Sequence, residues 1–191
     1  MEELRKTITN LIKTNKQQTD YVLSHFEKRH LAKDKYFVGI GERCDEVAFL
    51  KSGIVRFYYL SKHDEETTCY FAFPNEFITS IKSFNSKSES RECLQAATNA
   101  ELYVIKRNAI EKLYQEIPAT QFITRKVYES LSLNLQKRIA LLQINSAEER
   151  YDYLLNHQSV LLKNVSLQHL ASFLGVTPQH LSRLRKQKTI A

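Results

Sequence analysis

The hydrophobic positions of the chain follow two periods, and the change from one to the other marks its main parts. Up to about residue 31, apolar side chains recur at helical spacing, which predicts amphipathic helices with a break near Asn15. Between Tyr36 and Ile105 the apolar residues instead form short β-branched and aromatic runs separated by turn formers. These runs, YFVGI, EVAFL, IVRFYYL, TTCYFAF and ELYVI, predict a compact antiparallel β-domain with the form of a roll or barrel.

The helical period returns after Pro118 and continues to Ile144. This predicted helix is apolar on more than one side, because Phe122 and Leu133 lie away from its main apolar stripe. Its own β-domain and a partner subunit would together cover both sides, and burial within one chain is the alternative. We therefore expect a homodimer. The predicted dimer interface consists of Ile123, Val127, Leu131, Leu135, Ile139 and Leu142.

A hinge at residues 144–146 is expected to separate the long helix from the C-terminal part of the chain. Ser146 and Glu149 form an S-x-x-E capping box, which predicts the start of another helix. A short turn is expected after that helix, around Lys163 and Asn164.

The stretch from Val165 to Lys188 has the pattern of two short helices that meet at a tight turn. Ser166 is placed to cap the first helix, and Gly175 stands where the chain must leave it through a left-handed conformation. Thr177 then offers a cap oxygen, and Pro178 falls at the first helical position. We interpret the stretch as a helix-turn-helix. The residues expected to lock the two helices together are Ala171, Val176, Leu181 and Leu184.

The distribution of charge supports an interaction with nucleic acid. The composition is that of a globular protein, with 42% hydrophobic and 26% charged residues, and the net charge is +7. Five basic residues and no acidic residue follow Asp152, so a polyanion is the natural partner. An ordinary solvated pair of helices is the alternative. The predicted DNA-binding residues, which suit base edges or phosphates, are Thr177, Gln179, His180, Ser182, Arg183, Arg185, Lys186 and Lys188.

Other kinds of chemistry are not indicated. Cys44, Cys69 and Cys93 are widely spaced, and the six histidines show no ligand spacing, so we expect reduced thiols, no metal and no cofactor. No glycine-rich phosphate loop, nucleophile elbow or metal-spaced histidine pair supports an enzyme. The sequence has neither the long apolar run of a membrane span nor a signal peptide, so we expect a cytoplasmic protein with no membrane contact.

The predicted order of β-roll, long helix, hinge and helix-turn-helix resembles the Crp/Fnr superfamily over nearly the whole chain. The segments SGIVRFYYL, SAEERYDYLL and LASFLGVTPQHLSRLRK carry the resemblance. It implies a cytoplasmic, dimeric transcription regulator in which a cyclic-nucleotide-binding-like roll senses an effector and the second motif helix enters the major groove. Gln179, Ser182 and Arg183 match base-reading positions of the family, and His180 lies beside them.

Details of the reading helix set further expectations. Arg183 suits guanine, because a guanidinium can donate to O6 and N7 together. Gln179 stands where many members of the family carry Glu, so we expect a base preference that differs from the usual half-site. We expect the β-hairpin wing that often follows this helix in the family to be missing or minimal. Phosphate contacts are therefore expected from Thr177, Arg185, Lys186 and Lys188.

The residues at the family's cyclic-nucleotide pocket differ from the usual pattern. That pocket has a Gly-Glu pair and an Arg-Ser or Arg-Thr pair, whereas this chain has Asn75-Glu76 and Arg91-Glu92. A carboxylate at Glu92 would repel a phosphate, and Asn75 lacks the freedom of glycine. We therefore expect no dependence on cyclic AMP. Glu76 and Arg91 are the effector-pocket candidates, expected to form a structural pair, and the effector itself is unknown.

The sequence thus predicts an α+β fold with an N-terminal antiparallel β-roll, a long dimerisation helix and a C-terminal helix-turn-helix domain. The expected parts are residues 1–117, 118–145 and 146–191. The leading hypothesis is a dimeric, sequence-specific DNA-binding regulator. Its two reading helices would meet major grooves roughly 34 Å apart, so its operator would be a palindrome. RNA polymerase is a candidate partner. The alternative is a small-ligand receptor with vestigial DNA binding that acts through a protein partner.

Overall fold

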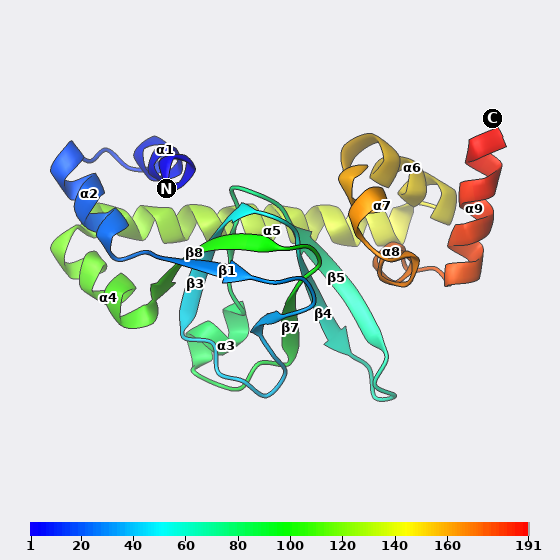
Figure 1. Ribbon diagram of the computed structural model, residues 1–191, viewed down its shortest axis with the longest axis horizontal. Helices are drawn as coiled ribbons and strands as arrows, with labels where there is room; N and C mark the ends of the chain where they lie inside the picture. The colour runs from blue at the N-terminus through cyan, green and yellow to red at the C-terminus, as the bar shows by residue number, and fades with distance from the viewer. Residues whose placement is uncertain (191) are drawn as a thin grey trace. The chain divides into compact units, whose positions relative to one another are not determined.

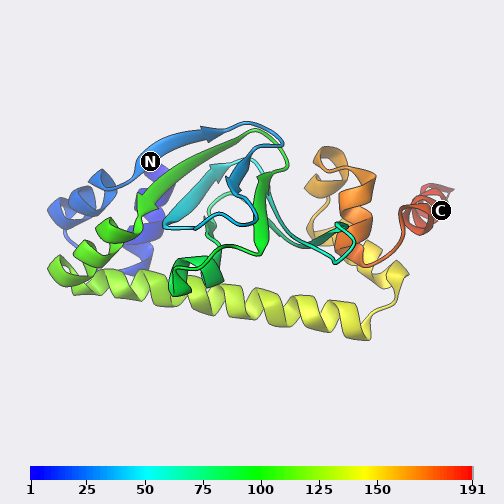
Figure 2. The same ribbon diagram turned by 90° about the horizontal axis from the view of Figure 1, so that it is seen from below.

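The computed structural model describes residues 1–190, with side chains up to residue 188, and the end of the predicted third part, Ala191, lies outside it. The chain forms two compact units (Figures 1 and 2). The first contains residues 1–57 and 71–131, and the second contains residues 58–70 and 132–190. The elements are α1 (Glu2–Leu11), α2 (Lys16–Ser24), β1 (Glu27–Leu31), β2 (Tyr36–Val38), β3 (Glu46–Ser52), β4 (Val55–Leu60), β5 (Glu66–Ala72), β6 (Phe77–Ile78), α3 (Ile81–Ser86), β7 (Glu92–Ala96), β8 (Ala100–Lys106), α4 (Arg107–Glu116), a 3-10 turn (Pro118–Thr120), α5 (Gln121–Ile144), α6 (Ala147–His157), α7 (Val160–Asn164), α8 (Leu167–Leu174) and α9 (Pro178–Ile190).

Two four-stranded sheets make the β-roll and confirm the predicted α+β fold class. Their strand orders are β1-β8-β3-β6 and β2-β7-β4-β5. β3 is antiparallel to both β8 and β6, with Ala48 opposite Val104 and Ile78. Successive side chains of a strand point to opposite faces, so Ala48 and Leu50 share one face of β3 while Phe49 lies on the other. All three are fully buried, because both faces of this strand are covered.

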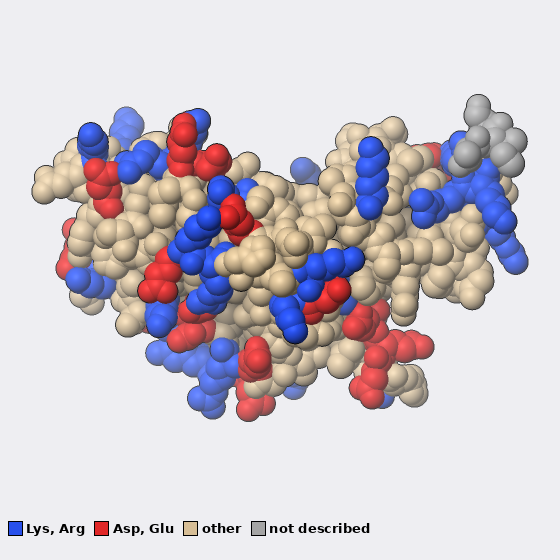
Figure 3. Space-filling view, viewed as in Figure 1, with Lys and Arg blue, Asp and Glu red and all other residues tan. Residues whose placement is uncertain are grey.

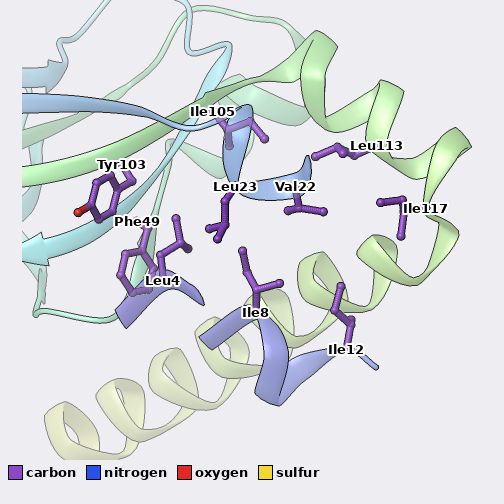
Figure 4. Packing of buried hydrophobic residues seen from close by; sticks show 10 residues of the cluster. All are labelled: Leu4, Ile8, Ile12, Val22, Leu23, Phe49, Tyr103, Ile105, Leu113 and Ile117. Atoms are coloured by element: carbon purple, nitrogen blue, oxygen red, sulfur yellow. The ribbon is translucent and has the colours of Figure 1, made fainter. Parts of the chain in front are cut away.

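One face of the first sheet is covered by helices that precede β1 and by α4, which follows β8. Phe49, Tyr103 and Ile105 project from the strands toward Ile8 of α1 and Leu113 of α4 (Figure 4). The N-terminal helices therefore act as the cover that their amphipathic pattern predicts. Leu4 and Ile8 are both fully buried, at 0% exposure.

The structure corrects the secondary structure predicted for several segments. The helical region was expected to reach residue 31, but α2 ends at Ser24 and residues 27–31 form β1, paired with β8. The sequence did not predict α3, α4, β6 or β7. Residues 160–164 form the short helix α7, where a turn around Lys163 and Asn164 was expected. Each of these segments is short, and packing against distant parts of the chain decides its conformation.

The predicted long helix is confirmed as α5, and its apolar residues divide between two environments. Ile123, Val127 and Leu131 are half-buried against the first unit. Leu135 and Ile139 are exposed, at 56% and 53%. Half of the predicted dimer interface therefore packs within its own chain. Among the described residues, no helix has both the length and the hydropathy needed to cross a membrane.

Candidate nucleic-acid interface

The first helix of the predicted helix-turn-helix is α8. The side chain of Ser166 accepts a hydrogen bond from the backbone N–H of His169 at 3.2 Å, so the predicted N-cap is confirmed. The helix buries Leu170 and Ala171 completely. It ends at Gly175, which has a φ of 66° and so takes the left-handed conformation predicted for it.

The second helix, α9, begins as the sequence predicts. The hydroxyl of Thr177 accepts a hydrogen bond from the backbone N–H of His180 at 3.2 Å, and Pro178 occupies the first helical position. Leu181 and Leu184 are buried at 0% and 6% exposure. Because these two leucines fix one face of α9 on the domain, the opposite face is turned to solvent.

The predicted DNA-binding side chains come from α9 and the residue before it, and Figure 3 shows Lys and Arg side chains over this helix. Six of the eight side chains are exposed, and those of Ser182 and Arg185 are half-buried. Lys188 is engaged within the protein, because its ammonium lies 3.0 Å from carboxylate oxygens of both Asp152 and Glu148. Hydrogen bonds to these two carboxylates raise the pKa of Lys188. The exposed predicted residues are Thr177, Gln179, His180, Arg183, Lys186 and Lys188.

Two arginines hold the C-terminal end of α8. Arg138, on α5, donates a hydrogen bond to the carbonyl of Phe173 and stacks on the Phe173 ring, 4.1 Å from the ring centroid. Arg150, on α6, donates from Nε to the carbonyl of Leu174 at 2.8 Å. The last carbonyls of a helix lack partners within the helix and carry its negative dipole end, so two cations there are favourable. Burial lowers the pKa of Arg138 to about 10.

The outer part of the β4–β5 hairpin belongs to the same unit as the motif. Ser172 of α8 accepts a hydrogen bond from the backbone N–H of Thr68 at 2.8 Å and donates one to the carbonyl of Glu66 at 3.0 Å. The His169 ring lies 3.5 Å from the carboxylate of Glu66. The hairpin thus contacts the face of α8 that carries His169 and Ser172.

The effector-pocket candidates do not form the expected pair. The carboxylate of Glu76 accepts a hydrogen bond from the backbone N–H of Phe73, and Arg91 is exposed and pairs with no carboxylate in residues 1–188. Asn75 has a φ of 75°, so it takes a left-handed conformation at this turn although it lacks the freedom of glycine. Asn is the non-glycine residue that best tolerates this region. Glu92 accepts a hydrogen bond from the Ser80 hydroxyl at 2.8 Å.

Sequence reasoning missed the contacts that support the motif. Arg138, Arg150 and Ser172 bind backbone groups, and the sequence does not show which backbone group a side chain will meet. A basic residue near the end of a predicted helix is a weak signal, since most such residues are solvated.

Comparisons with known proteins find a matching domain family and similar solved structures. Residues 28–117 match the family model of the cyclic nucleotide-binding domain. No curated protein sequence matches the chain significantly. One similar solved structure is FixK2 from Bradyrhizobium japonicum, with 20% identity and a TM-score of 0.73; the match covers 85% of this chain and 83% of that one. Another is the c-di-GMP responsive regulator CLP from Xanthomonas campestris, with 19% identity and a TM-score of 0.75; the match covers 92% of both chains. A third, classed in the Crp/Fnr family of transcriptional regulators, is from Eubacterium rectale, with 17% identity, a TM-score of 0.71 and coverage of 93% and 84%.

The fold and the motif define a class of protein in which a cyclic-nucleotide-binding-type β-roll is joined through a long helix to a C-terminal helix-turn-helix. The domain match covers residues 28–117, and the structural neighbours share the fold of most of the chain. At identities of 17–20% the neighbours show the fold alone, and the chemistry of this chain depends on its own residues.

Proposed function

We propose that this protein is a dimeric, sequence-specific DNA-binding transcription regulator whose α9 reads the major groove. The observation that carries the proposal is the orientation of α9. Leu181 and Leu184 are buried, while Gln179 and Arg183 on the other face are exposed. An exposed guanidinium and amide on a capped, rigid helix have the donors that recognise guanine and adenine edges. Such a regulator would act in the cytoplasm, with RNA polymerase as its further partner.

The dimer would form along the second half of α5. Leu135, Ile139 and Leu142 are exposed at 56%, 53% and 39%, and their spacing of four and three residues places them on one stripe. Three large apolar side chains on one helix face favour burial against an identical helix, with the spacing of a coiled-coil seam. The three parts of the chain would then serve as sensor, dimerisation helix and DNA reader, and the two-fold symmetry would require a palindromic operator.

Regulation by cyclic AMP is not part of the proposal. The carboxylate of Glu92 is held by the Ser80 hydroxyl beside the position where the family binds a phosphate. A fixed negative charge there would oppose a cyclic phosphate, and Arg91 is turned to solvent.

The test is DNA selection followed by measurement of affinity with single variants. We expect the wild-type protein to select a palindrome from random duplexes. Arg183→Ala removes one contact from each half-site, so it should weaken binding to that site by about 2–6 kcal/mol, at least roughly 30-fold, and relax the preference at one base pair of each half-site. Fluorescence anisotropy with the selected and a scrambled duplex would measure both effects.

Lys163→Ala is the matched control, because Lys163 is an exposed cation on α7, outside the reading helix. It should leave base preference unchanged. Equal affinities of wild type and Arg183→Ala for the selected duplex would reject the proposal. That result would favour the alternative, a small-ligand receptor that acts through a protein partner.

A further inference from the structure

A cavity of about 90 Å³ lies between the helices and the first sheet of the β-roll. Its walls come from α1 to α5 and from β3, β6 and β8. Val47 and Ile105 form the part of the sheet that it touches, and these two residues pair across β3 and β8. They lie on the helix-covered face of the sheet, opposite to the face that carries Ala48 and Leu50. Neither Glu76 nor Arg91 lines the cavity.

The lining of the cavity contains no charged residue. Its hydroxyl groups are already engaged within the protein. Tyr114 and Thr124 bond to each other at 2.5 Å, and Tyr128 donates to Asn85 at 2.9 Å. Thr79 donates to a backbone carbonyl at 2.8 Å, and so does Thr120. A ligand in this cavity therefore meets apolar surface and no polar group that needs a partner.

We propose that this cavity is a binding site for a small, uncharged, apolar molecule. A cyclic nucleotide does not fit this chemistry, because its phosphate would lose its hydration and gain no donor. The volume sets the size of the occupant. Apolar cavities of roughly 150 Å³ bind benzene and stay free of water, so a cavity of about 90 Å³ suits a single small ring or a short alkane.

The floor of the cavity links it to the long helix. Ile123, Val127 and Leu131 of α5 line it, and α5 is the helix that continues toward the hinge. An occupant would therefore contact α5 directly, in the half of the helix that packs on its own chain. The proposal concerns the first unit alone and does not depend on whether the protein binds DNA.

Benzene is the probe for the test, because its ring current shifts the NMR signals of nearby methyl groups. We expect a titration of the full chain to shift the methyl signals of Ile8, Val22 and Val127 in a saturable way and to raise the melting temperature. Cyclic AMP at the same concentration should shift none of them. Val127→Phe fills the cavity and should abolish the shifts of the remaining methyl groups.

Leu133→Phe is the matched control, since it adds an aromatic ring on α5 where the side chain is exposed and lies outside the proposed dimer interface. It should leave benzene binding intact. Ile110→Ala widens the cavity and should strengthen binding, so the proposal can still be tested if Val127→Phe does not fold. Absent shifts in the wild type, unchanged shifts in Val127→Phe, or their loss in Leu133→Phe would each overturn the proposal. The last result would place benzene on the exposed surface of α5.

Discussion

At the scale of single residues, backbone conformation decides how the two motif helices meet. Gly175 has a φ of 66°, and a Cβ at this position would have a methyl carbon of Leu142 as its nearest neighbour, at the ordinary separation of 3.4 Å. A lack of room for a side chain is therefore not the reason for glycine at this position. Glycine is favoured because the backbone is left-handed, and in that conformation a Cβ comes close to the following carbonyl oxygen. Asn75 meets the same requirement at another turn without glycine.

Substitution of Gly175 should separate backbone conformation from packing. Gly175→Ala should lower the free energy of unfolding by about 1 kcal/mol, because alanine is strained at positive φ. Gly175→Asn carries a larger side chain but should cost less, since asparagine tolerates the left-handed region. Urea denaturation followed by circular dichroism would measure both. A greater loss for Gly175→Asn than for Gly175→Ala would show that crowding near Leu142 dominates.

At the scale of elements, α5 has two apolar faces in different surroundings. Ile123, Val127 and Leu131 line the cavity of the first unit. Leu135 and Ile139 are exposed, and so is Leu133 on another side of the helix, at 56%. The exposed fraction of a side chain alone therefore does not identify the dimer seam. Leu135 and Ile139 differ from Leu133 because Leu142 continues their stripe.

Charge placed on that stripe should dissociate the dimer. Leu135→Glu sets like charges opposite each other in a desolvated seam, so we expect a monomer in sedimentation velocity at micromolar concentration. Leu133→Glu is the matched control, because Leu133 is equally exposed but lies outside the stripe, and this variant should remain dimeric. Dimerisation along this stripe is contradicted if the wild type sediments as a monomer or if both variants remain dimers.

The elements also show which parts of the fold the sequence can predict. Caps were predicted correctly at Ser146, Ser166 and Thr177, because a cap is a contact between residues three apart. The strand at residues 27–31 was missed, since its pairing with β8 joins residues 69 to 77 positions apart, beyond the reach of local patterns. The cavity could not be predicted either, because it arises where elements far apart in the sequence fail to fill the space between them. The outward face of α9 was predictable from periodicity, and the ion pairs of Lys188 were not.

At the scale of the whole molecule, the positive charge is concentrated at the C-terminal end. Five basic residues and no acidic residue follow Asp152, and Lys and Arg side chains gather over α9 (Figure 3). The structure further divides these cations by their surroundings. Arg183 and Lys186 are exposed, whereas Lys188 is compensated by Glu148 and Asp152. The charge available to a polyanion is therefore smaller than the sequence count implies.

This division predicts how DNA affinity depends on salt. If each subunit of a dimer places Arg185 and Lys186, two of the predicted phosphate contacts, on phosphates, about four counterions are released, and the slope of log K against log[salt] should be roughly −4. Lys186→Ala removes one contact from each subunit and should make the slope shallower by about 2. Lys188→Ala should change the slope less, because the Lys188 ammonium already has two carboxylate partners. Anisotropy titrations between about 50 and 200 mM salt would measure all three slopes. Equal flattening by the two lysine variants would mean that Lys188 leaves α6 to bind phosphate, so that DNA binding would break both of its ion pairs.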